Sequence, residues 1–83
     1  MEKSAAERLD AEELLHLALK ASGENGHEQS ITYLKRALEL KPNEGRLHYM
    51  LAAEHAQMGL YDRAAEEMAR AVELDPSLVT AHF

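Results

Sequence analysis

Arg36-Ala37-Leu38-Glu39-Leu40-Lys41-Pro42 and Arg70-Ala71-Val72-Glu73-Leu74-Asp75-Pro76 are two copies of one pattern, and they lie 34 residues apart. A fixed period of this length is typical of stacked supersecondary units and not of one continuous globular core. Each copy ends in a proline, which removes an amide donor and disfavours helical geometry in the preceding residue. The pattern therefore predicts repeated helical units that end near Pro42 and Pro76.

Glycine and proline residues divide the rest of the chain into segments of helix length. A left-handed residue in the turn that contains Asn25 and Gly26 would allow a tight reversal between the first two helices. Capping boxes are possible at Ser4-x-x-Glu7 and at Asp10-x-x-Glu13, and Asn43 and Ser77 are expected to cap later helices. We expect helices over these ranges: Ala5 or Ala11 to Ser22, His27 to Leu40, Glu44 to Met58, Asp62 to Leu74, and a short fifth helix after Pro76.

Large and small residues recur at matching places in the two units, and this pattern resembles the tetratricopeptide repeat. The first unit reads Leu14-x2-Leu17-Ala18-x2-Ala21, Ser30-x3-Leu34, Ala37 and Pro42; the second reads His48-x2-Leu51-Ala52-x2-His55, Ala64-x3-Met68, Ala71 and Pro76. Positions that the family fills with aromatic residues carry Ala21, His48 and His55 here. A 35-residue helical hairpin repeat that reads RNA is the nearest competitor, and both the spacing and the acidic charge disfavour it.

The resemblance implies an all-α fold, an α-solenoid of antiparallel helix hairpins that forms a single domain. Residues 1–10 would extend the first helix, residues 11–44 and 45–78 would form two complete repeats, and residues 79–83 would begin a truncated third repeat, with His82 equivalent to Leu14 and His48.

The resemblance also implies a protein-binding scaffold, because the first helix of each unit lines a concave groove in this family. A peptide or an amphipathic helix is the expected ligand, since Leu, Tyr and Met offer adaptable apolar contact. Carried over to this chain, the groove would be lined by Glu12, Leu15, His16, Leu19 and Ser22 from one unit and by Arg46, Tyr49, Met50, Ala53 and Gln57 from the next. Some members of the family bind a terminal carboxylate with Lys and Asn side chains in this groove. The matching positions in this chain hold Leu15, Leu19 and Met50.

The unfinished third unit leads to a second hypothesis, a structural role in a homo-oligomer or in a longer solenoid. Arrays of this kind normally end in a polar capping helix, because the last unit otherwise leaves an apolar face in water. We expect self-association through Ala65, Met68, Val72 and Phe83, by docking or by exchange of helices.

Composition excludes several other classes of function. Nine Lys and Arg residues against fifteen Asp and Glu residues give a net charge of −6, which has the wrong sign for binding nucleic acid. The chain has no cysteine and no apolar run long enough to span a membrane, so we expect a cytoplasmic protein without disulfides. The sequence offers no set of nucleophile, base and orienting group for a catalytic site, and no phosphate-binding loop. We therefore expect neither an enzyme nor a cofactor.

Histidines are the remaining candidates for chemistry, and the repeat pattern favours structural roles for them. His48 and His55 are seven residues apart, so on a helix they share a face but are two turns apart, too far to bind one metal ion without other ligands. Both fall at packing positions of the repeat. His16 lies on the opposite side of its helix, where a surface role is expected.

Overall fold

The computed structural model describes the backbone of residues 10–80 and the side chains up to Leu78. This part of the chain is helical, with α2 at Ala11–Gly23, α3 at His27–Leu40, α4 at Gly45–Gln57, α5 at Tyr61–Leu74 and α6 at Ser77–Thr80. The predictions for Ser4, His82 and Phe83 lie outside the described residues. The all-α prediction is confirmed, and the bounds predicted for the second helix agree with those of α3.

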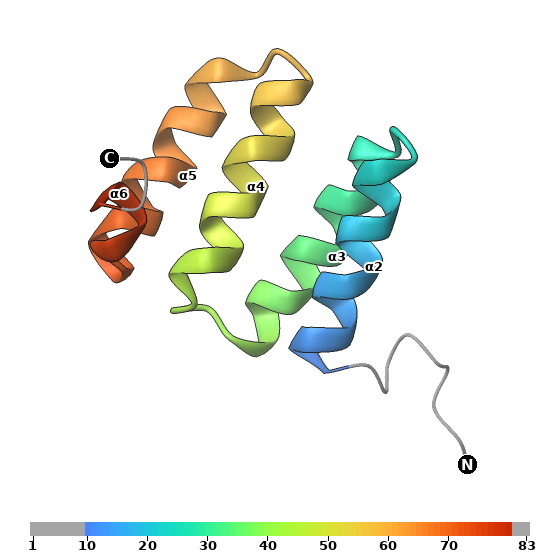
Figure 1. Cartoon of the computed structure of the whole chain (residues 1–83), viewed down its shortest axis with the longest axis horizontal. Coiled ribbons are helices and arrows are strands. Elements are labelled where there is room, and N and C mark those ends of the chain that lie inside the picture. The colour runs from blue at the N-terminus through green and yellow to red at the C-terminus, as the bar shows by residue number, and fades with distance from the viewer. Residues whose placement is uncertain (1–9, 81–83) are drawn as a thin grey trace.

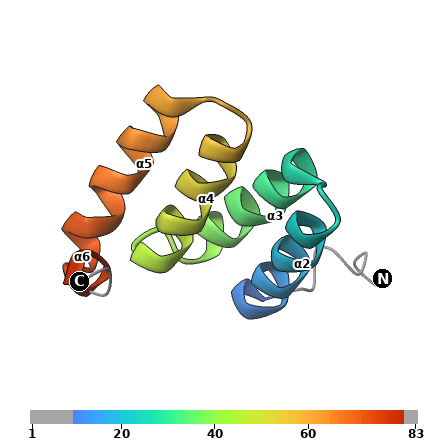
Figure 2. The same cartoon turned by 45° about the horizontal axis from the view of Figure 1, so that its top comes forward.

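The helices form two hairpins that stand side by side. Contacts join α2 to α3, α3 to α4 and α4 to α5, so each helix packs on the next one along the chain. Figures 1 and 2 show the same order in space, with α2 at one end of the array and α5 with α6 at the other. This arrangement is the stacked solenoid that the 34-residue period predicts.

Helix ends follow local chemistry. Asp10 and Glu13 form a capping box at the start of α2: the Asp10 side chain accepts from the Glu13 amide at 2.9 Å, and the Asp10 amide donates to the Glu13 side chain at 3.4 Å. Asn43 was expected to cap the third helix, and this expectation is wrong, because Glu44 occupies the cap position without a side-chain hydrogen bond. Ser77 is likewise the first residue of α6, and its amide donates to Asp75 Oδ1 at 3.1 Å.

The turns of the two hairpins repeat each other. Asn25 and Gly59 occupy equivalent positions, and both adopt a left-handed backbone, with φ of 63° and 78°. The amide three residues beyond the last helical residue bonds back into the helix in each case, from Gly26 to the Ala21 carbonyl at 2.7 Å and from Leu60 to the His55 carbonyl at 2.8 Å. Of the two residues expected to allow the reversal, Asn25 therefore adopts the left-handed conformation.

The core lies where α2, α3 and α4 meet. Its buried members are Ala11, Leu14, Leu15, Ala18, Leu34, Ala37, Leu47 and Leu51. Small residues allow close approach of the backbones: a Cβ at Gly45 would come within 2.9 Å of Asp75 Cβ and 3.0 Å of the Ala71 carbonyl oxygen. The first turn of α4 therefore packs directly against the end of α5.

Candidate partner-binding face

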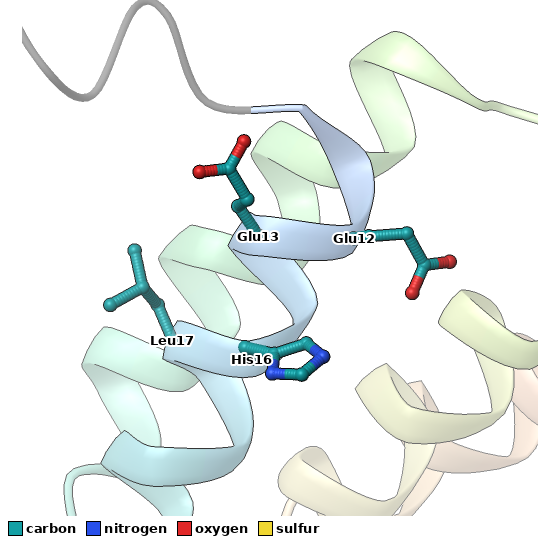
Figure 3. A pocket seen from close by; sticks show the side chains of 4 residues that line it. All are labelled: Glu12, Glu13, His16 and Leu17. Carbon is teal, nitrogen blue, oxygen red and sulfur yellow. The ribbon is translucent and has the colours of Figure 1, made fainter.

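The candidate binding face is formed by α2 and α4, the first helices of the two hairpins. Arg46 Nη2 lies 3.0 Å from Glu12 Oε1, and these two residues are 34 positions apart. Equivalent positions of the two helices therefore come together at this point. Figure 3 shows Glu12 and His16 pointing from α2 toward the side on which α4 lies, whereas Glu13 and Leu17 point away from it.

Most of the predicted groove residues are at least partly exposed. Leu19 has 52% of its surface exposed, and Tyr49 and Met50 are half-buried. His16, Ala53 and Gln57 are exposed, and Ser22 is half-buried. The face that we define by these residues together with Glu12 and Arg46, the α2/α4 face, thus combines apolar area with polar groups.

Leu15 departs from the prediction for the groove. It is only 6% exposed and belongs to the core cluster, so it holds α2 in place and offers little area for contact. Helical periodicity placed it beside His16 and Leu19, but it did not show how closely the core packs against this side of α2. Met50 also packs against the core cluster, with part of its side chain still accessible.

Charge on the α2/α4 face is largely balanced. Glu12 and Arg46 neutralise each other in an ion pair whose side chains are 59% and 51% exposed. Exposed pairs of this kind contribute only about 0–1 kcal/mol to folding, so the pair fixes little by itself. The face therefore offers apolar area and not a strong field of one sign.

A part-buried hydrogen bond between a histidine and a glutamate also joins the two hairpins. His27 Nδ1 lies 2.6 Å from Glu54 Oε2, and the Glu54 side chain is only 9% exposed. A polar side chain at this depth needs a hydrogen-bond partner, because burying it without one is costly. This contact between the start of α3 and the last turns of α4 sets how the second hairpin sits against the first.

The two histidines expected at packing positions are buried there, at 7% exposure for His48 and 5% for His55. His48 Nδ1 lies 3.1 Å from Glu67 Oε2, and its Nε2 lies 3.0 Å from the Pro42 carbonyl oxygen. Both neighbours are acceptors, so the ring serves each with an N–H when both nitrogens carry a proton. His48 thereby ties α4 both to the preceding turn and to α5.

His55 lies against a hollow between three helices. Its Nδ1 is buried without a hydrogen-bond partner among the described residues. The hollow is lined by Lys35 of α3, His55 of α4, and Arg63, Glu66 and Glu67 of α5. Within residues 10–80, no group of three or more His, Cys, Asp or Glu side chains is arranged to hold a metal ion.

Comparison with known proteins identifies the repeat to which the two hairpins belong. Family models described as tetratricopeptide repeat match residues 14–44 and residues 45–78, which together cover most of the chain. A comparison with curated proteins gave no match. No helix in the described part of the chain has the length and apolar character required to cross a membrane.

Proposed function

The chain belongs to the tetratricopeptide repeat family, and on this premise we propose that it is a binding module whose α2/α4 face holds a peptide or an amphipathic helix of another protein. Repeats of this family generally mediate protein–protein interaction. The observation that carries the proposal is the accessible apolar area on this face, above all Leu19 with 52% of its surface exposed. The 34-residue repeat pattern puts Leu19 on the same side of the array as Tyr49 and Met50.

The face favours an apolar ligand over a strongly charged one. Arg46 is already neutralised by Glu12 at 3.0 Å, so it does not attract an acidic group as a free cation would. Tyr49 and Met50 supply an aromatic ring and a flexible thioether, which suit apolar side chains of varied shape. A short segment with two or three large apolar side chains, spaced to reach both α2 and α4, matches these features.

Replacing Leu19 with Asp is expected to weaken ligand binding by at least about tenfold, because it places a charge in the apolar area. Leu40 provides a matched control: it is an exposed leucine on α3, outside the α2/α4 face, with 56% of its surface exposed. Peptides selected from a displayed library on the purified domain provide the ligands, and fluorescence anisotropy measures their affinity for the wild type, Leu19→Asp and Leu40→Asp. Equal losses in both variants, or a loss in Leu40→Asp alone, would place the ligand elsewhere.

A second candidate function is self-association through the α5 end. Ala65 is exposed, and Met68 and Val72 are half-buried, although all three are apolar. Exposed apolar stripes on small domains tend to be protein-binding surfaces, and a second copy of the chain can bind there.

Sedimentation at micromolar concentration is expected to show a species heavier than the 9.3 kDa chain. Met68→Glu should return the protein to a monomer, because it introduces a charge into the apolar stripe. Leu19→Asp is the control, since it lies at the opposite end of the array and should leave the assembly intact. A wild-type protein that sediments only as a monomer would contradict this second candidate.

A further inference from the structure

The hollow between α3, α4 and α5, which we call the α3/α4/α5 hollow, is polar and lies outside the set of residues that defines the α2/α4 face. Its volume of about 340 Å³ is at the lower end of the range for small-molecule sites, roughly 300–1,000 Å³. Helices that the structure describes supply all of its lining side chains: Lys35, His55, Arg63, Glu66 and Glu67. Both signs of charge therefore meet in one small space.

The deepest residue of this hollow carries an unsatisfied polar atom. His55 has only 5% of its surface exposed, and its Nδ1 has no hydrogen-bond partner among the described residues. Buried polar atoms are nearly always hydrogen-bonded, so an orphaned one calls for an explanation. When the proton of the neutral ring is on Nε2, Nδ1 is an acceptor, and a donor bound in the hollow would satisfy it.

Glu67 supplies a second acceptor to the same hollow. Its side chain is 27% exposed, and its Oε2 lies 3.1 Å from His48 Nδ1. This contact holds the carboxylate against α4 and leaves Oε1 to accept another hydrogen bond. Two acceptors, one on α4 and one on α5, suit a group with several N–H donors, such as an ammonium.

Two cationic side chains complete the hollow. Lys35 of α3 and Arg63 of α5 are both exposed. Across residues 10–80, neither side chain forms an ion pair or a hydrogen bond with a described residue. Arg63 and Glu67 are one helical turn apart, but Glu67 contacts His48 instead. An arginine fork and a lysine ammonium suit the two oxygens of a carboxylate.

The mixture of charges disfavours ligands that carry one charge only. A bare anion in the hollow would meet the carboxylates of Glu66 and Glu67, and a metal ion would meet the cations of Lys35 and Arg63. A ligand with a positive and a negative group close together avoids both penalties. A peptide terminus does not match this requirement, because it carries only one of the two groups.

We propose that the α3/α4/α5 hollow binds a small zwitterion, a free amino acid whose ammonium and carboxylate are joined through one carbon atom. The ammonium would donate to His55 Nδ1 and Glu67 Oε1. The carboxylate would accept from Lys35 and Arg63, and Glu66 would disfavour ligands with a second negative charge. This site is separate from the α2/α4 face and does not depend on its proposed function.

Glycine is the probe, titrated into the full-length protein at low ionic strength and followed by NMR of the backbone amides and the histidine rings. We expect saturable shift changes at Lys35, His55 and Arg63, with little change in α2. A ligand this small is expected to bind with a Kd of about 1–10 mM. Acetate and methylammonium, which carry one charge each, should bind at least about tenfold more weakly, because each makes only half of the contacts.

Two substitutions test the contacts. Arg63→Gln should weaken glycine binding by at least about fivefold, because it removes a charge-assisted donor from the carboxylate. Arg70→Gln is the matched control, since Arg70 is an exposed arginine of α5 outside the hollow, and it should leave the affinity unchanged. His55→Phe keeps an aromatic ring but removes the buried acceptor, so it should also weaken binding, and circular dichroism checks that it remains folded.

Three results would overturn the proposal. The first is the absence of saturable shift changes with glycine. The second is acetate or methylammonium binding as tightly as glycine, because the hollow would then select a single charge. The third is an equal loss in Arg63→Gln and Arg70→Gln, which would reveal a general effect of charge. Arg63 is exposed, so its substitution gives a result even where His55→Phe does not fold.

Discussion

Leu34→Ala is expected to lower the free energy of unfolding by about 2–5 kcal/mol, the range measured for large cavities in protein cores. Leu34 has no exposed surface and lies in the core cluster between the two hairpins. A domain of this size is stabilised by roughly 4–12 kcal/mol in total, so the substitution removes a large share of it. Urea denaturation followed by circular dichroism measures the loss.

The repeat offers a matched control for this substitution. Met68 occupies the equivalent position in the second hairpin and is only half-buried, so Met68→Ala should cost about 1 kcal/mol. The two variants remove a side chain of similar size from the same place in the repeat, and they differ in whether a following helix covers it. Equal losses at low protein concentration would show that Met68 is covered in solution.

His27→Ala is expected to cost about 2–3 kcal/mol, because it leaves the buried Glu54 carboxylate without its partner. Breaking a fully buried pair costs more, but the His27 side chain is 24% exposed and water can partly replace it. The same denaturation experiment, or the shift in melting temperature, measures the effect.

Arg46→Ala is the control for the ion pair between the hairpins. Its partner Glu12 is exposed, so the loss should stay within about 0–1 kcal/mol. Both substitutions break a contact between the first and second hairpins, one in the interior and one at the surface. A loss in Arg46→Ala as large as that in His27→Ala would mean that burial does not decide the strength of these pairs.

Much of the backbone could be predicted from the sequence because its signals are local. Pro42 and Pro76 keep the preceding residues, Lys41 and Asp75, out of helical geometry, so α3 and α5 end at Leu40 and Leu74, as expected. Asp10 and Glu13 form the expected capping box. Asn43 and Ser77 were exceptions, because Glu44 and not Asn43 occupies the cap position of α4, and Ser77 is the first residue of α6.

The polar contacts between hairpins could not be predicted in this way. His27 and Glu54 are 27 residues apart, and their meeting depends on how closely α4 packs against α3. His48 was placed at a packing position by the repeat, yet its partners Glu67 and the Pro42 carbonyl emerged only from the folded arrangement. The burial of Leu15 could not be predicted for the same reason, because periodicity gives the direction of a side chain but not how closely other residues surround it.

The pairing of each helix with the next one along the chain also determines how this domain forms. Its principal contacts close short loops, so little chain entropy is lost before native contacts are made, and proteins of this kind fold within microseconds to milliseconds. Either hairpin can serve as the nucleus, and the other then adds to it. The helices should also unfold locally and not all at once. Helix α5, with a single buried residue, is expected to exchange its amide hydrogens faster than α4, which packs between two neighbouring helices.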